Sequence, residues 1–364
     1  PSLKVDGATI QEDKGPVAFK VTLSAASGLT VTVNYATTNG TATSSADYTA
    51  TSGTLTFSPG DTVKTVSVPV GADQVKEGDE TFTLTLSGPA NATISDAVAT
   101  AKLLNDDDPQ GYSLLGSDGG VFSFGNAKNK GSIPGAGLKL NQPPIGMAYT
   151  PSGNGYWIVA QDGGIFTFGD AQFFGSTGDV KLNAPVLGME PTPSGNGYWL
   201  FAGDGGIFSF GDAQFHGSMG ASKLNAPVIG MATTSTGNGY WLVAQDGGIF
   251  SFGDAQFFGS TGDIKLNQPV FDMAPMPDNA GYRLVARDGG VFSFGSAKSK
   301  FFGSAANANP ATVIGIGVTP TGNGYWIADQ RGVVYAFGDA RALGDLSGKG
   351  VTVVGFATAP QPTS

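Results

Sequence analysis

From Gly111 onward the sequence repeats six times, and this period constrains the fold more than any other feature. Successive repeat markers are 44, 42, 42, 42 and 43 residues apart. Each unit contains four short runs of β-forming residues separated by Gly, Asn, Asp or Pro. Four strands in about 42 residues is the size of one β-propeller blade. The marker of each unit is a Gly-Tyr pair, at Gly111, Gly155, Gly197, Gly239, Gly281 and Gly324.

Three recurring motifs predict the turns of these units. An Asn-Gly pair, as at Asn154-Gly155, indicates a tight hairpin because both residue types accept positive φ angles. An Asp-Gly-Gly motif does the same one strand later, and the aspartate of Phe-Gly-Asp-Ala is interpreted as a further turn residue. The density of turns excludes a helical solenoid but leaves a β-solenoid open. The aspartates concerned are Asp118, Asp162, Asp204, Asp246 and Asp288 in the first motif, and Asp170, Asp212, Asp254 and Asp339 in the second.

The two ends of the repeat region predict a closed ring. The first unit lacks the strand that precedes the Gly-Tyr marker in later units, and residues 351–357 match that missing strand. We therefore expect the C-terminal strand to complete the first blade of a six-bladed propeller and remove its open edge. The units resemble kelch-type and other bacterial surface propeller repeats. They lack the Gly-His and Trp-Asp pairs of WD repeats.

The composition changes at Asp106-Asp107-Asp108-Pro109, which predicts a domain of residues 1–109 followed by the propeller of residues 110–364. The first part is rich in Thr, Val, Ala and Ser, and its runs alternate between apolar and polar residues, with Phe82, Leu84 and Leu86 on one face. This pattern is typical of a β-sandwich, so the whole chain is expected to be all-β. The predicted strands are Leu3–Val5, Val17–Leu23, Thr30–Tyr35, Gly53–Phe57, Val63–Val68, Thr81–Ser87 and Val98–Leu104.

An ordered set of motifs in this first part resembles the Calx-beta domain, an Ig-like calcium-binding sandwich, over nearly all of residues 1–109. The motifs are Asn39-Gly40-Thr41-Ala42, Ala46-Asp47-Tyr48, Ser52-Gly53-Thr54-Leu55-Thr56-Phe57, Glu80-Thr81-Phe82 and Asn105-Asp106-Asp107-Asp108. The resemblance implies a Ca²⁺ site at one pole of the sandwich. The implied ligands are Glu12, Asp47, Asp73, Glu77, Asp106, Asp107 and Asp108.

Seven carboxylates gathered at one pole would repel one another unless a cation were bound. The family often has a second acidic residue just before Asp73, where this chain has Ala72, so the number of ions stays open. The alternative interpretation is that these are solvated acidic turn residues. Because Asp106–Asp108 also form the domain junction, binding is expected to stiffen the interdomain hinge as well as the sandwich.

Charge and residue usage exclude several classes of function. Residues 1–109 contain 13 acidic and 6 basic side chains, and the chain carries a net charge of −10. A basic stripe for nucleic acid is therefore absent, while an acidic half favours a divalent cation. There is no cysteine, one histidine and no nucleophile, zinc or phosphate-loop motif, so we expect no enzyme. Paired carboxylates for glycoside hydrolysis remain the alternative. No apolar run approaches the length of a membrane span.

The aromatic residues of the repeats divide into two groups. Residues such as Tyr156, Trp157, Phe166 and Phe168 are interpreted as packing between blades. The other group falls on the predicted outermost strand, where large apolar side chains either pack under a neighbour or form a contact surface. The first and sixth units break this pattern, and the single His216 is interpreted as a packing residue. The second group comprises Phe173-Phe174, Phe215-His216, Phe257-Phe258 and Phe301-Phe302.

Together these features predict a secreted, cell-surface, non-enzymatic module for adhesion or ligand binding, with calcium as the rigidifying ion. The partner would be a glycan or a protein bound at the propeller surface. The alternative is a structural unit that self-associates in a surface layer, stalk or filament. The chain begins at Pro1 without a signal peptide and ends in Pro-Gln-Pro-Thr-Ser, and we interpret it as a mature or excised piece of a longer protein.

Overall fold

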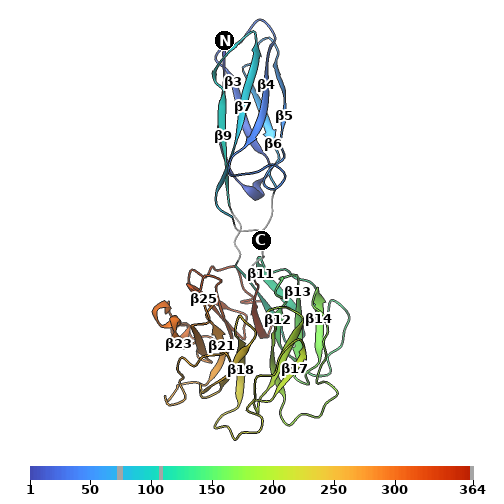
Figure 1. Cartoon of the computed structure of the whole chain (residues 1–364), viewed down its shortest axis with the longest axis vertical. Helices are drawn as coiled ribbons and strands as arrows, with labels where there is room; N and C mark the ends of the chain where they lie inside the picture. The colour runs from blue at the N-terminus through green and yellow to red at the C-terminus, as the bar shows by residue number, and fades with distance from the viewer. Residues whose placement is uncertain (72–76, 106–109, 361–364) are drawn as a thin grey trace. The chain divides into compact units, whose positions relative to one another are not determined.

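A computed structural model describes residues 1–71, 77–105 and 110–360. The chain divides into two compact units, Pro1–Asp108 and Pro109–Thr363. Both are built from β-strands, which confirms the predicted all-β class (Figure 1). None of the helices in the described ranges is long and apolar enough to cross a membrane. Those helices are the 3₁₀ turns η1 Glu12–Lys14, η2 Ser296–Lys300 and η3 Ala306–Ala308.

The first unit is a sandwich of two sheets. One sheet has the strand order β6-β3-β1-β8 and the other β2-β9-β7-β4-β5. All seven predicted strands are present, and β2 and β8 are additional. The bounds are β1 Ser2–Asp6, β2 Ala8–Gln11, β3 Val17–Leu23, β4 Val31–Asn39, β5 Ser52–Phe57, β6 Val63–Val68, β7 Glu80–Ala90, β8 Thr93–Asp96 and β9 Val98–Leu104.

The core of the sandwich follows from the alternation of apolar residues in its strands. Phe82, Leu84 and Leu86 of β7 are all buried on one face, as predicted. On β3, every second residue from Val17 to Leu23 is buried against them. Phe82 also stacks on the buried ring of Tyr48, with centroids 4.1 Å apart. This contact fixes the loop between β4 and β5 to the core.

The second unit contains six three-stranded antiparallel sheets, one for each sequence repeat. In the second to sixth sheets the strand before the Gly-Tyr marker is innermost. The bounds are β10 Gly111–Gly116, β11 Val121–Gly125, β12 Pro144–Tyr149, β13 Gly155–Ala160, β14 Ile165–Gly169, β15 Val186–Pro191, β16 Gly197–Ala202, β17 Ile207–Gly211, β18 Val228–Thr233, β19 Gly239–Ala244, β20 Ile249–Gly253, β21 Val270–Pro275, β22 Gly281–Ala286, β23 Val291–Gly295, β24 Val313–Val318, β25 Gly324–Asp329, β26 Val334–Gly338 and β27 Val353–Thr358.

The C-terminal strand closes the ring as predicted. β27 pairs with β10 in antiparallel register and so supplies the innermost strand of the first blade. It also packs against the innermost strands on both sides, β12 and β24. Each innermost strand therefore has two neighbours, and a β-solenoid, which would leave two free ends, is excluded.

The expectation of four strands per blade is wrong, because each described blade has three. The fourth segment is irregular, and side chains satisfy its backbone groups in place of a ladder. In the second blade, Trp157 Nε1 donates to the carbonyl of Gln172 at 2.7 Å. The hydroxyl of Tyr198, from the next blade, accepts from the Phe174 amide at 3.1 Å and donates to the carbonyl of Gly175 at 2.5 Å.

The turn prediction is correct for the Asp-Gly-Gly motif and wrong in detail for the Asn-Gly motif. In every Asp-Gly-Gly turn the aspartate accepts a hydrogen bond from the second glycine, as Asp162 does from Gly164 at 3.0 Å. In the other turn the positive φ belongs to Gly153 (67°) and not to the predicted Asn154-Gly155 pair. Gly155 is needed for a different reason, since a Cβ there would lie 2.4 Å from Asp170 Oδ1.

Aromatic side chains join neighbouring blades, as predicted. Trp157 and Tyr198, from adjacent blades, are fully buried with ring centroids 5.7 Å apart. Phe174 packs edge-on against Tyr198, and His216 packs on Tyr240 with tilted rings and centroids 5.5 Å apart. The histidine therefore takes the place of a phenylalanine in the packing.

Candidate functional site

Three carboxylates meet at one end of the sandwich. Asp47, Glu77 and Glu80 each offer one oxygen, and these oxygens lie within 4.8 Å of one another. Asp47 belongs to the loop between β4 and β5, Glu77 precedes β7, and Glu80 is the first residue of β7. The site thus joins segments that are about 30 residues apart in the chain.

A tight turn positions Asp47. Its Oδ2 accepts hydrogen bonds from the Thr43 amide at 2.6 Å and the Thr43 hydroxyl at 3.1 Å. Its own amide donates to the Thr43 carbonyl at 3.0 Å, which closes the turn. The next residue, Tyr48, is buried and its hydroxyl donates to Asn39 Oδ1 at 2.6 Å. The carboxylate is therefore held by its own loop.

Backbone contacts tie this loop to the start of β7. The Ala42 amide donates to the Thr81 carbonyl at 2.9 Å, and the Thr81 amide donates to Thr41 Oγ1 at 2.8 Å. Gly40 permits this approach, since a Cβ there would lie only 2.3 Å from the Thr81 carbonyl oxygen. The fold itself therefore keeps Asp47 next to Glu80.

Glu80 has a shifted pKa and one buried carboxylate oxygen. Burial, the charge of Asp47, a hydrogen bond with the Asp47 carboxylate and the charge of Glu77, in that order, raise its pKa above the ordinary value of 4.5. Its Oε2 is buried and accepts no hydrogen bond from any residue that the structure describes. An unpaired buried oxygen is unfavourable unless a proton or a cation is bound to it.

The adjacent Asp79 has a different environment. Its Oδ2 lies 2.7 Å from Lys102 Nζ, and its Oδ1 accepts from the Asn105 amide at 3.3 Å. The hydrogen bond from Lys102 is the main reason that the pKa of Asp79 is lowered. Asp79 is therefore paired with a cation and does not belong to the cluster.

The predicted ligands fall into three groups. Asp47 and Glu77 are brought together, while Glu12 is buried at 6% exposure in η1 and is not one of the three clustered residues. Four predicted ligands lie outside the described residues: Asp73, Asp106, Asp107 and Asp108.

The strand register nevertheless relates Glu12 to the cluster. β2 runs parallel to β9 with Gln11 opposite Leu104, and β7 is antiparallel to β9 with Glu80 opposite Leu103. Glu12 directly follows Gln11, so both glutamates emerge at the same end of this sheet.

Glu80 is the residue that sequence reasoning did not choose as a ligand. It was seen only as part of the Glu-Thr-Phe motif. The missed signal is its position in the strand alternation. Glu80 is two residues before Phe82 and therefore lies on the same, inward face of β7. A carboxylate at the inward-facing end of a strand needs a partner inside the site.

The donor set suits a hard cation. All three clustered ligands are carboxylates, and no nitrogen or sulfur donor belongs to the group. Ca²⁺ takes six to eight oxygen ligands, many of them carboxylates from different loops. Asp47, Glu77 and Glu80 are the described residues that would hold the ion, and its double positive charge would offset their repulsion.

Comparison with known proteins finds a family similarity for the sandwich. Residues 2–108 match the Calx-beta domain. The crystal structure of the apo-form Calx CBD1 domain is 26% identical, with a TM-score of 0.28, over 29% of this chain and 100% of that one. The CBD12 structure from CALX1.2 is 25% identical, with a TM-score of 0.29, and the match covers 32% of this chain and half of that chain.

The propeller has a more distant structural neighbour. The β-propeller domain of Cps50 (Swd1) from Myceliophteria thermophila is 10% identical, with a TM-score of 0.44, over 65% of this chain and 82% of that one. At that distance the likeness carries no argument about function. No curated protein matches the chain.

Proposed function

We propose that this chain is a calcium-binding, non-enzymatic module of an extracellular surface protein. In this proposal the sandwich binds Ca²⁺ at Asp47, Glu77 and Glu80, and the propeller presents a surface to a glycan or protein ligand. The buried, unpaired Glu80 Oε2 among two other carboxylates is the observation that carries the calcium assignment. The match of residues 2–108 to the Calx-beta domain supports it.

Titration calorimetry of the chelator-treated chain with CaCl₂ tests this assignment. We expect binding at or below millimolar calcium, and we expect Glu80→Gln to weaken it at least tenfold because one anionic ligand is lost. Asp79→Asn is the matched control, since it removes one charge from the adjacent residue, which is paired with Lys102. The assignment fails if the wild type gives no calcium heat, or if both variants bind as the wild type does.

The proposed role of calcium extends to the interdomain hinge. Asp106–Asp108 would contribute further ligands there, although they lie outside the described residues. Small-angle scattering of the full chain should then give a narrower distribution of interatomic distances in calcium than in chelator. Identical distributions in the two conditions would argue against a calcium-dependent hinge and would leave the sandwich site itself in place.

An exposed row of phenylalanines supports a contact surface on the propeller. Phe173, Phe215 and Phe257 are each 60% exposed and Phe301 is 54% exposed. They occupy the same repeat position in four consecutive blades, while the first and sixth blades have Asn129 and Ala342 there. The second member of each pair packs on the tyrosine of the next blade, and of these second members Phe302 is still 41% exposed. The first members therefore provide most of the contact surface.

This surface favours two candidate functions, ligand binding and self-association, and one variant addresses both. Replacing all four phenylalanines by Asn, the residue of the first blade, should preserve the fold. We expect the variant to lose binding on a glycan array if the surface is adhesive. If the chain is instead a structural unit, light scattering of the wild type should reveal assembly that the variant lacks. A variant equal to the wild type in both assays would rule out a role for this surface.

The kelch-type character of the repeats and the secreted location remain predictions within this proposal. The absence of catalysis is likewise part of it. A glycan-active enzyme would release reducing ends from a polysaccharide panel, and we expect no such release.

A further inference from the structure

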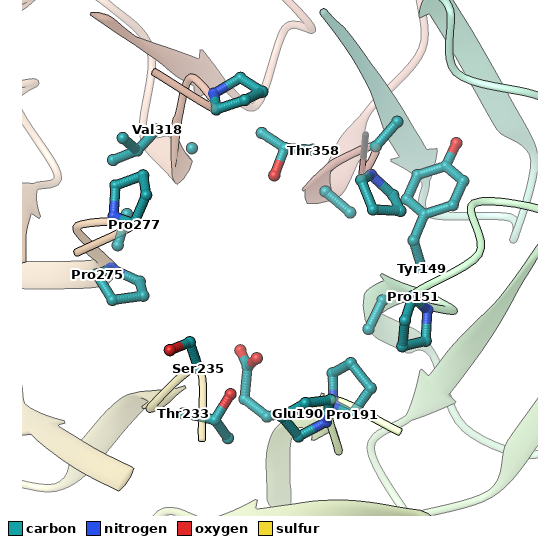
Figure 2. A pocket seen from close by; sticks show the side chains of 18 of the residues that line it. Tyr149, Pro151, Glu190, Pro191, Thr233, Ser235, Pro275, Pro277, Val318 and Thr358 are labelled. Atoms are coloured by element: carbon teal, nitrogen blue, oxygen red, sulfur yellow. The ribbon is translucent and has the colours of Figure 1, made fainter. Parts of the chain in front are cut away.

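A cavity lies on the axis of the propeller. It has a volume of about 690 Å³, and residues from all six innermost strands line it. Figure 2 shows their side chains around an open centre, with Glu190 extending into it. A second cavity of about 110 Å³ shares several lining residues with the first. The shared residues include Glu190 and Asp272, so these two acids lie where the cavities meet.

The two acids stand where the other repeats have glycine or alanine. Asp272 is the third residue of β21, and Glu190 is the fifth residue of β15. Neither carboxylate is needed for the ring to form, because the other blades have glycine or alanine at the same positions. The residues equivalent to Asp272 are Gly146, Gly188, Gly230, Gly315 and Gly355, and those equivalent to Glu190 are Ala148, Ala232, Ala274, Gly317 and Ala357.

The two carboxylates differ in their partners. Asp272 is anchored, because its oxygens accept from the amide of Met273 at 2.8 Å and from that of Ile316, in the next blade, at 3.0 Å. Glu190 receives no hydrogen bond from any described residue, and it lies deep in the channel with part of its surface toward the cavity. No Lys, Arg or His is among the described residues that line either cavity. The channel therefore contains negative charge without a protein counter-ion.

The remaining wall is largely apolar. Proline rings make up much of it, among them Pro151, Pro191 and Pro275 (Figure 2). The methionines Met147, Met189 and Met273 stand behind this wall, because each is at most 7% exposed and packs between blades. A volume of this size accommodates a small organic molecule, since such sites span about 300–1,000 Å³.

We propose that the axial channel binds an organic ammonium ion, with its nitrogen at Glu190 and Asp272 and its apolar body against the proline rings of the wall. A bare metal ion is the weaker candidate. Both oxygens of Asp272 already accept backbone amides, and the apolar wall offers no further ligands to a metal. An alkylammonium ion would pair its positive nitrogen with the acids and place its alkyl chain against the apolar wall.

Protonation supports the same assignment. Burial, and then the charge of Asp272, raise the pKa of Glu190 to about 8, and burial raises the pKa of Asp272 to about 7. Tyr149 is the one other titratable residue among the described lining residues, and burial raises its pKa further above 10. At neutral pH the acid pair therefore retains a proton that an incoming ammonium ion would displace.

Calorimetry with 1-pentylamine as the probe tests the proposal, with 1-pentanol and CaCl₂ as comparison ligands. We expect the amine to bind, the alcohol to bind at least tenfold more weakly, and the affinity for the amine to rise between pH 6.5 and 8.5. Proton release should make the apparent heat depend on the ionisation enthalpy of the buffer. Nα-acetyl-lysine-N-methylamide is a second probe, which carries the ammonium group on a lysine side chain. Its binding relative to that of pentylamine distinguishes a lysine side chain from a free amine as the natural ligand.

Variants locate the binding. Glu190→Ala installs the residue of most other blades, and Glu190→Gln retains the shape, so at least one of them should fold. Both should weaken pentylamine binding at least tenfold and abolish proton release. Asp179→Asn, an exposed acid outside both cavities, is the charge control. Equal binding of amine and alcohol, no amine binding, binding of calcium alone, or unchanged binding in both Glu190 variants would overturn the proposal.

Replacement of Glu190, which should weaken amine binding, should at the same time stabilise the folded propeller at alkaline pH. A carboxyl group whose pKa is higher in the folded state takes up protons on folding, so stability falls as pH rises from about 4.5 to about 8. Glu190→Ala should therefore lie above the wild type in Tm at pH 8.5 and close to it at pH 4.5. A variant that is less stable at pH 8.5 would contradict the buried, unpaired state of Glu190.

Discussion

Millimolar calcium is expected to raise the Tm of the sandwich by on the order of 10 °C relative to chelator-treated protein. A ligand at 100 times its Kd stabilises the folded state by about 2.7 kcal/mol. For a domain of about 100 residues, each kcal/mol shifts Tm by about 4–8 °C. The three clustered carboxylates should lose their mutual repulsion when the ion binds, which is the physical source of the effect.

The propeller provides an internal control for this experiment. All four tryptophans of the chain belong to it, so tryptophan fluorescence follows the propeller alone, while calorimetry follows both units. Calcium should move the calorimetric transition of the sandwich and leave the fluorescence midpoint unchanged. Glu80→Gln should remove most of the shift. A fluorescence midpoint that moved while the sandwich transition did not would place the calcium site elsewhere.

The calcium effect should also depend on pH in a defined direction. Because the pKa of Glu80 is raised in the calcium-free fold, that fold loses stability as pH rises above about 4.5. Calcium competes with the proton, so its stabilisation should be small at pH 4.5 and grow toward neutral pH. Stabilisation that is largest at acid pH would contradict a carboxylate site.

Removal of the closing strand is the second change with a large expected effect. A chain ending at Lys349 lacks β27, which pairs with β10 and packs against β12 and β24. The buried Val353 and its contacts with Leu114 and Leu346 would be lost as well. Each large apolar side chain exposed costs about 1.5–3 kcal/mol, and the ladder adds to this, within a typical net stability of about 5–15 kcal/mol.

We expect this truncated chain to lose cooperative unfolding of the propeller by tryptophan fluorescence and to aggregate through the open edge of β10. A chain ending at Pro360 keeps β27 whole and should behave as the full chain does. A monomeric truncated protein with an unchanged fluorescence midpoint would show that closure by β27 is dispensable.

The repeat period and the alternation of apolar residues were sufficient to predict the sandwich strands, the six blades and the closing strand. Period and alternation report backbone geometry, which local sequence determines well. The fourth strand was predicted wrongly because its segment has the composition of a strand. Its backbone groups are instead bonded by Trp157 of its own blade and Tyr198 of the next, contacts that local sequence does not reveal.

The candidate sites were less predictable than the fold. The resemblance to a family implied Asp47 and Glu77 as ligands. Glu80 became apparent only from the structure, in which it lies on the same face of β7 as Phe82 and close to the other two carboxylates. Glu190 and Asp272 depart from the repeat, but the sequence alone did not lead us to select them. Their position in a shared cavity could be recognised only in the closed ring, because closure arranges the innermost strands of all blades around one cavity.

A crystal structure of the full chain grown in calcium tests the central claim most directly. We expect one density peak with oxygens of Asp47, Glu77 and Glu80 at about 2.3–2.6 Å, and an anomalous signal consistent with calcium. Density containing only water between these carboxylates, at saturating calcium and neutral pH, would contradict the account.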